Sequence, residues 1–95
     1  MKLYLTAIIK SKPEFSEEVK MVLEDMVLQT RKEIDCIRYD LHQGVDDKDL
    51  FVVYEIWAHQ KGLDLHNQQP YFKAFRTIVS TKLQQEPVLL LTHLL

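Results

Sequence analysis

The strands that this sequence predicts are apolar on both faces, and this feature restricts the possible folds most. In residues 2–10 (KLYLTAIIK), every odd-numbered position from Leu3 to Ile9 is apolar, yet Tyr4 and Ile8 lie on the opposite face. Residues 50–57 (LFVVYEIW) and 88–94 are apolar at nearly every position. A sheet built from such strands needs cover on both sides, because a large exposed apolar patch marks an interaction surface.

The other segments predict two helical regions and one more strand. Ser11 to Glu14 has the S-x-x-E spacing of a capping box, which predicts a helix start. Apolar residues then recur at helical spacing to about Lys32, namely Phe15, Val19, Val22, Leu23, Met26 and Val27. In residues 36–45, Ile37, Tyr39 and Leu41 alternate with Arg38, Asp40 and His42, which predicts a strand. Residues 59–66 and 71–83 predict a short and a longer helix, the second closed by Glu86-Pro87.

This order of elements, β-α-β-β-α-β, predicts an α+β fold of the ferredoxin-like plan, in one domain of residues 1–95. Its antiparallel four-stranded sheet carries both helical regions on one face. One chain therefore has no cover for the second apolar face, and we expect a homodimer through the open sheet face. Such a contact typically buries more than roughly 2,000 Å² in total. A different partner is the alternative, but nothing in the sequence requires one.

Composition excludes several classes of partner and compartment. The formal net charge is −2, with acidic and basic residues interspersed, which argues against nucleic-acid binding. No apolar run approaches the ~20 residues that span a bilayer, so we expect no membrane segment. A single cysteine, Cys36, cannot form an intramolecular disulfide, which favours the reducing cytoplasm.

Glu55 and His66 are the candidate catalytic residues. Glu55 has the strand parity of Val53 and Trp57, so it points to their side of the sheet. A buried carboxylate without a partner has a raised pKa, which suits a general acid or base. The structural alternative is an ion pair with an arginine, either Arg38 or Arg76. His66 follows Leu63 on the same helical side, and the alternative there is a core histidine with its hydrogen bonds satisfied.

Aromatic residues with the same parity could complete a pocket. Tyr39 and Trp57 either pack in the core or line a cavity with aromatic walls and a few titratable groups. The four histidines (His42, His59, His66 and His93) are scattered over different elements, and no H-x-x-x-H or C-x-x-C spacing occurs. The sequence therefore predicts no metal site.

Three short motifs in a fixed order carry a resemblance to a known family. They are C-x-x-Y at Cys36–Tyr39, Y-E-x-W at Tyr54–Trp57, and L-x-x-H at Leu63–His66 with P-x-F following at Pro70–Phe72. Together they resemble the antibiotic biosynthesis monooxygenase family, and within it the small bacterial quinol monooxygenase-like proteins. The resemblance covers nearly the whole chain and implies a dimeric α+β barrel with a ligand pocket between helices and sheet.

The resemblance also implies a chemistry. In the monooxygenases of this family no metal or organic cofactor is used, and the anion of a phenol or quinol reduces dioxygen directly. On this basis Glu55 or His66 is the expected base and Tyr39 hydrogen-bonds a substrate oxygen. Trp57 and Phe72 wall the substrate ring.

Other members of the family leave alternatives open. Some isomerise a phosphorylated sugar signal, for which Arg76 and Lys73 would matter more, and a non-catalytic, stress-related binding module is also possible in such a fold. Haem-degrading members carry a histidine at the end of an F-K-x-x-H string. Here the matching string runs from Phe72 to Arg76, so an arginine stands where those members have the histidine. This argues against haem degradation. Arg76 could instead bind an anionic group of a substrate.

Overall fold

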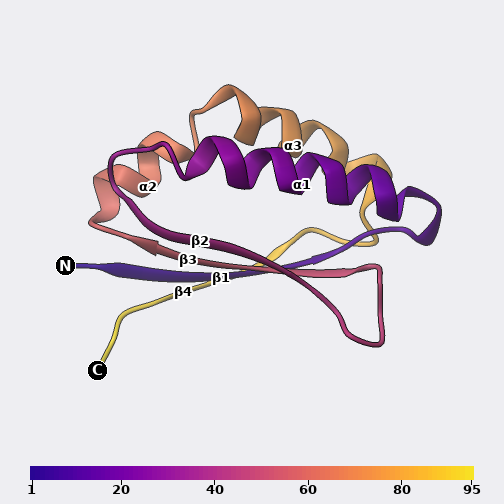
Figure 1. The fold of residues 1–95 in the computed structure, drawn as a ribbon, viewed down its shortest axis with the longest axis horizontal. Coiled ribbons are helices and arrows are strands. Elements are labelled where there is room, and N and C mark those ends of the chain that lie inside the picture. The colour runs from indigo at the N-terminus through magenta and orange to yellow at the C-terminus, as the bar shows by residue number, and fades with distance from the viewer.

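The computed structural model describes residues 1–95 as a four-stranded sheet with helices on one face (Figure 1). The elements, in chain order, are β1 (Leu3–Lys10), a 3-10 turn η1 (Pro13–Phe15), α1 (Ser16–Thr30), β2 (Cys36–Gln43), β3 (Leu50–Trp57), α2 (Gln60–His66), α3 (Pro70–Lys82) and β4 (Val88–Thr92). The strands are all antiparallel to their neighbours, in the order β2-β3-β1-β4. The predicted ferredoxin-like α+β fold is confirmed.

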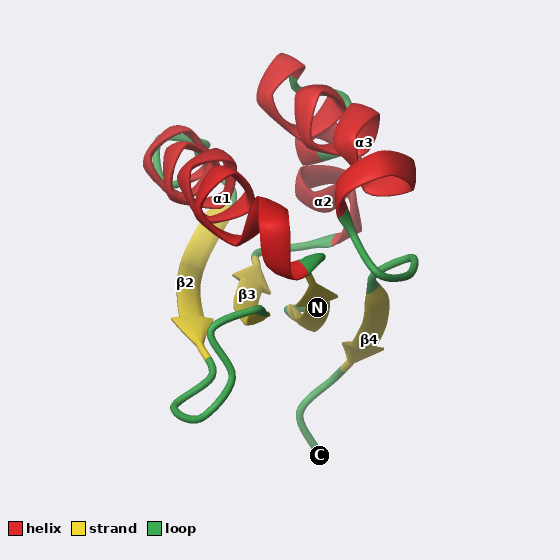
Figure 2. Cartoon of the chain, turned by 90° about the vertical axis from the view of Figure 1, so that its right-hand side faces the viewer, coloured by secondary structure: helices red, strands yellow, loops and turns green.

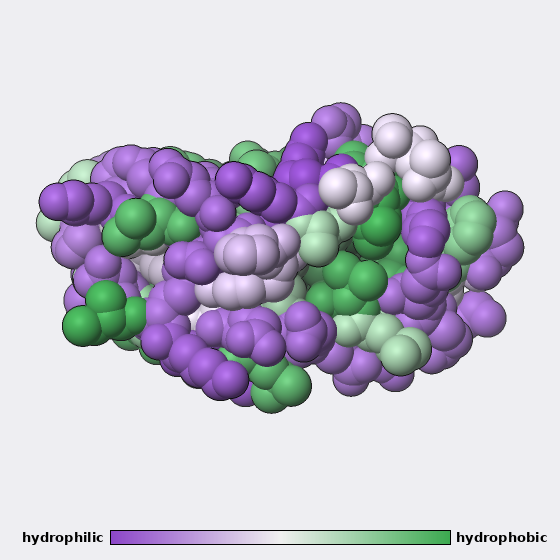
Figure 3. Space-filling view, turned by 90° about the horizontal axis from the view of Figure 1, so that it is seen from above, coloured by the Kyte–Doolittle hydropathy of each residue, from purple (hydrophilic) through white to green (hydrophobic).

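The core lies between the sheet and the three helices. Buried and half-buried residues alternate along β3 and along β1 as far as Ile9, and the buried set faces the helices. The side chains of Val19, Phe51 and Trp57 are completely buried there. Seen from the helical side, the surface is mostly hydrophilic, with hydrophobic atoms in separate patches (Figure 3). The helical layer therefore shields one face of the sheet.

The opposite face of the sheet is uncovered in the single chain (Figures 1 and 2). It carries Tyr4, Ile8 and Val52, which are half-buried by their own neighbours in the sheet. In β4, all five residues are exposed, and Leu90 on this face is 49% exposed. Both faces are therefore apolar, as the sequence predicted, and one of them has no cover within the chain.

Several local predictions were wrong. The capping box does not form, because the sheet holds Ser11 through the Asp49 carbonyl and a bridge to Leu83, and the Ser11 hydroxyl donates to the Lys12 carbonyl. The helix begins only at Ser16, after the 3-10 turn, and ends at Thr30. Strands β2 and β4 also end two residues earlier than expected.

A β-bulge near the start of β2 interrupts the predicted alternation of its side chains. Cys36 lies opposite Trp57, but the next paired residue is Arg38, opposite Ile56. Ile37 is the extra residue and is 50% exposed, so it does not share the inner face with Tyr39. The bulge leaves Tyr39 opposite Glu55, and thereby places both polar side chains on the helical side.

No helix is long and apolar enough to cross a membrane.

Candidate active site

A largely apolar cavity lies between the helical layer and the sheet. Its volume is about 310 Å³, and 10 of its 15 lining residues are hydrophobic. Strand β1 supplies its floor through residues such as Leu5 and Ala7, and α3 supplies Phe72 and Phe75. Glu55 and His66 both line it. The two candidate catalytic residues are thus brought to one hollow from β3 and α2.

Glu55 is held in this cavity by its strand position and by one hydrogen bond. Its side chain is 5% exposed, and Trp57 Nε1 donates to Glu55 Oε1 at 2.9 Å. The suggested arginine partners are wrong, because Arg38 pairs with Asp40 at 2.8 Å and Arg76 with Glu86 at 3.1 Å.

Glu55 is buried without a cationic partner, and its carboxyl is therefore partly protonated near neutral pH. Burial raises the pKa of the Glu55 carboxyl from 4.5 to about 7, the hydrogen bond from Trp57 opposes this rise, and the nearby Glu33 charge adds to it. A carboxyl with this pKa can accept or donate a proton close to neutrality.

Glu55 gives a testable dependence of stability on pH. Its pKa in the folded state lies above its ordinary value, so the folded protein holds a proton that the unfolded chain has lost between about pH 4.5 and 7. The contribution of Glu55 to stability should therefore fall as the pH rises through this window. Glu55→Gln keeps the acceptor for Trp57 without the charge. Its free energy of unfolding relative to the wild type should rise by up to about 3 kcal/mol between about pH 4.5 and 8.

The measurement is denaturant unfolding of the wild type and Glu55→Gln across this pH range. Any contribution common to both proteins, such as that of His66, cancels in their difference. Glu24→Gln, at an exposed position in the middle of α1, is the matched control for replacing a glutamate by glutamine. A difference between Glu55→Gln and the wild type that stays constant with pH contradicts the raised pKa.

His66 ends α2 and is surrounded by aromatic rings. The residue is 1% exposed, and its ring centroid lies 4.8 Å from that of Trp57, 5.2 Å from Phe72 and 5.6 Å from Tyr39. Burial lowers the pKa of the His66 imidazole, and the hydrogen bond and charge of Glu33 partly oppose this. The ring is therefore neutral at neutral pH and retains one free lone pair.

Glu33 contacts His66, and the sequence did not reveal this contact. It lies in the connection between α1 and β2, and its Oε2 is 2.8 Å from His66 Nδ1. Tyr71 Oη donates to the same oxygen at 2.5 Å. No periodicity or spacing in residues 31–35 marks Glu33, because it reaches His66 only through tertiary packing.

Gly62 allows α2 to pack closely against the connection between α1 and β2. A Cβ at Gly62 would overlap the side chain of Asp35, so only glycine lets the helix lie against the α1–β2 connection. The His59 Nδ1 accepts from the Gly62 N–H at 3.2 Å and caps the start of α2. The local sequence thus brings His66 within reach of Glu33.

The remaining predicted site residues lie in different places. Tyr39 lines the cavity and is 3% exposed, and burial and the charge of Glu55 raise the pKa of its phenol. Phe72 lines the cavity and is half-buried. Trp57 does not line it but packs behind His66. Arg76 lies at the exposed edge of the cavity and is engaged by Glu86.

Two other groups show no arrangement for chemistry. No three His, Cys, Asp or Glu side chains converge closely enough to hold a metal ion. Cys36 is half-buried against the core, and burial raises the pKa of its thiol to about 11. Cys36 therefore packs as a small hydrophobe.

Comparison of the sequence with known proteins identifies the family. A sequence model of the family described as "Antibiotic biosynthesis monooxygenase" matches residues 3–78. The Bacillus subtilis protein named "Putative monooxygenase YcnE" is 34% identical over 71 residues, which cover 75% of this chain and 75% of that protein. An uncharacterised Synechocystis protein is 33% identical over 67 residues, or 70% of this chain, and the match spans 46% of that relative's length.

Solved structures agree with the sequence comparison. A crystal structure of a Pseudomonas aeruginosa protein matches with a TM-score of 0.93 and 30% identity, covering 99% of this chain and 94% of that one. A crystal structure of an antibiotic biosynthesis monooxygenase matches with a TM-score of 0.91 and 27% identity, covering 98% of each chain. The match over residues 3–78 includes all three motifs that carried the resemblance. The chain belongs to the antibiotic biosynthesis monooxygenase family.

Proposed function

We propose that this protein is a monooxygenase that oxidises a small phenol or quinol with dioxygen and needs no metal or organic cofactor. The observation that carries the proposal is the presence of Glu55 and His66 in one largely apolar cavity. The family and the relatives named as monooxygenases support the reaction class. The cavity of about 310 Å³ is at the small end for ligand sites, which favours a single-ring substrate.

The protein's part in this reaction is to bind, deprotonate and shield the substrate. His66 or Glu55 takes the proton of a substrate hydroxyl, and Tyr39 hydrogen-bonds a substrate oxygen. Phe72 packs on the ring, while Trp57 supports His66 and Glu55 from behind rather than touching the substrate. Exclusion of water from the apolar cavity protects the reactive anion.

The proposed overall reaction is balanced without another reductant. A quinol and dioxygen give a hydroxyquinone and water, so that one oxygen atom enters the ring and the other leaves as water. The substrate supplies both hydrogen atoms of that water and all four electrons. The base only has to create the electron-rich anion, which reduces dioxygen itself.

The charge of the cavity favours this function over isomerisation of a phosphorylated sugar. A phosphate requires several cationic or N–H donors. Arg76 is the sole cation among the lining residues, and it is paired with Glu86. Lys73 is exposed and is not part of the lining. The apolar walls suit a flat, uncharged ring better.

Oxygen consumption with a panel of quinols and phenols tests the proposed function. We expect oxygen uptake above the spontaneous rate with at least one single-ring quinol, and no product in parallel anaerobic incubations. Thermal stabilisation by aromatic ligands without oxygen uptake would instead support the non-catalytic binding module. The absence of both oxygen uptake and thermal stabilisation with every compound of the panel would contradict an aromatic ligand site in this cavity.

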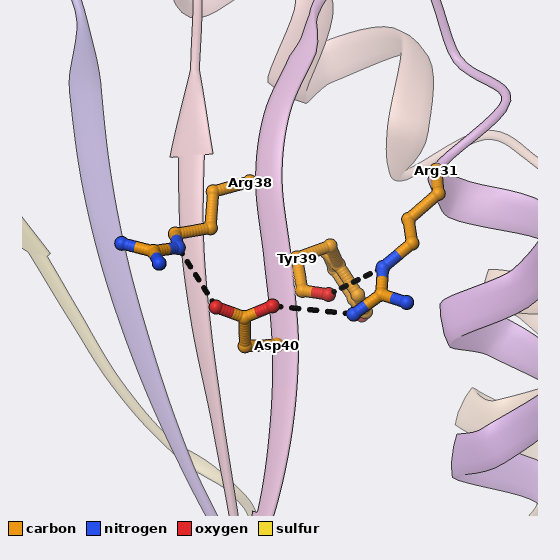
Figure 4. Close-up of polar contacts among 4 residues, drawn as sticks. All are labelled: Arg31, Arg38, Tyr39 and Asp40. Carbon is orange, nitrogen blue, oxygen red and sulfur yellow. Dashed lines mark hydrogen bonds and ion pairs between the residues drawn. The ribbon is translucent and has the colours of Figure 1, made fainter.

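We also propose that two copies associate through the open sheet face. Its centre is apolar through Ile8, Val52 and Ile56, and Leu90 continues it on β4. At the β2 edge, Asp40 accepts from Arg38 and Arg31, as Figure 4 shows. An apolar centre with a polar rim is typical of protein interfaces.

The dimer predicts a large effect of one charge on this face. In light scattering, the wild type should have about twice the chain mass of 11.3 kDa. Val52→Lys should give single chains, because an unpaired ammonium would be buried between the two sheets. Met21→Lys, at a 68% exposed apolar residue of α1, is the control and should remain a dimer. A stable wild-type monomer in dilute buffer refutes this interface.

A further inference from the structure

We propose that Glu33 is a positioning residue, which fixes His66 in the tautomer protonated on Nδ1 and presents the lone pair of Nε2 to the cavity. Nothing in the sequence motifs points to Glu33, and the inference stands on the contacts of three separate elements. Its consequence for catalysis rests on the proposed function, but the tautomer itself does not.

The hydrogen bonds of Glu33 decide which nitrogen of His66 carries the proton. Glu33 Oε2 lies 2.8 Å from His66 Nδ1 and 2.5 Å from Tyr71 Oη. Burial and Glu33 raise the pKa of Tyr71 above its ordinary range, so its hydroxyl keeps its proton and donates. An ionised carboxylate only accepts, and His66 Nδ1 must therefore be the second donor to the same oxygen.

The position of Glu33 shows which edge of the imidazole faces the cavity. Glu33 does not line the cavity but a separate small hollow beside Ile34 and Gly62. The Nδ1 edge of His66 is thus turned toward that hollow, while the His66 side chain also lines the cavity. No protein group hydrogen-bonds Nε2. The free nitrogen is the one available to a ligand.

The same contact stabilises the product of proton transfer. When Nε2 accepts a proton, the imidazolium lies beside the Glu33 carboxylate, which opposes the desolvation that otherwise disfavours the charge. Of the other titratable groups near the ring, Tyr39 and Tyr71 are neutral phenols, and Glu55 lines the same cavity but bonds to Trp57 rather than to His66. Glu33 is therefore the nearest compensating charge, and His66 rather than Glu55 is the better supported proton acceptor.

Nitrogen NMR of histidine-labelled protein measures the tautomer directly, without a substrate. At slightly alkaline pH, wild-type His66 should show a protonated Nδ1 and an unprotonated Nε2. Glu33→Ala should lose this preference and give mixed or Nε2-protonated imidazole. A wild-type Nε2–H tautomer, or an unchanged Nδ1–H tautomer in Glu33→Ala, overturns the inference.

Glu33→Gln separates charge from hydrogen bonding and disturbs the packing least. Its amide oxygen can replace Oε2 and accept both hydrogen bonds, so the tautomer should remain while the pKa of His66 falls below the wild-type value. An unchanged pKa of His66 contradicts the electrostatic role. Tyr71→Phe is the matched control, because it removes the other donor and should leave the Nδ1–H tautomer intact.

Turnover distinguishes this inference from the proposed function. If both are correct, Glu33→Ala should lower kcat by at least about tenfold with little change in KM, and Glu33→Gln should lie between it and the wild type. The predicted tautomers without any turnover would leave the positioning role intact and refute the monooxygenase. Normal turnover by Glu33→Ala would refute the positioning role alone.

Discussion

Replacement of Trp57 by alanine should lower the free energy of unfolding by about 3–5 kcal/mol. Trp57 is completely buried, and its ring packs 4.8 Å from that of His66. It also donates the one hydrogen bond that Glu55 receives from a side chain. The variant loses a large apolar contact and leaves a buried carboxyl without its partner. Since small domains are stable by only about 5–15 kcal/mol, this change is severe.

Urea unfolding monitored by circular dichroism measures this effect. Trp57→Phe is the matched variant, because it keeps an aromatic ring but removes the N–H donor. It should cost about 1–3 kcal/mol and raise the pKa of Glu55 further. Equal losses of unfolding free energy in Trp57→Ala and Trp57→Phe would show that packing of the aromatic ring contributes little to stability. A loss below about 1 kcal/mol in Trp57→Ala would contradict its place in the core.

Replacement of His66 by alanine should lower kcat/KM for an active quinol at least tenfold. Removal of a general base typically costs about 10²–10⁴ in rate. The loss should appear mainly in kcat, because the apolar walls that bind the ring remain. Steady-state oxygen consumption over a range of quinol concentrations gives both constants.

Two controls separate catalysis from folding. His93→Ala removes an exposed histidine that follows β4 and does not line the cavity, and it should keep full activity. His66→Gln retains a polar side chain of similar length, and its circular dichroism spectrum should match that of the wild type. Unchanged turnover in a folded His66 variant would end the assignment of His66 as a catalytic residue.

Much of the fold follows from the local pattern of the sequence. Strict alternation in β1 and β3 predicted which side chains face the helices, including Glu55 and Trp57. The apolar second face predicted the uncovered side of the sheet. These features depend on the period of a strand alone, which a single sequence displays.

The details that failed depend on interactions between distant segments. The bulge at Ile37 is set by pairing with β3, and Ser11 is held by Asp49 and Leu83 rather than by the helix it precedes. Glu33 meets His66 only because α2 packs on the α1–β2 connection. The sequence could predict the two candidate bases, but not the carboxylate that orients one of them.

Incorporation of an oxygen atom from labelled dioxygen into the product tests the proposed monooxygenase activity most directly. The protein should be incubated with an active quinol under heavy-isotope dioxygen, and the product analysed by mass spectrometry. The account predicts a hydroxylated quinone that carries one labelled oxygen atom in wild-type protein, and much less of it in His66→Ala. A product without the label, or one that forms equally fast without the protein, would contradict it.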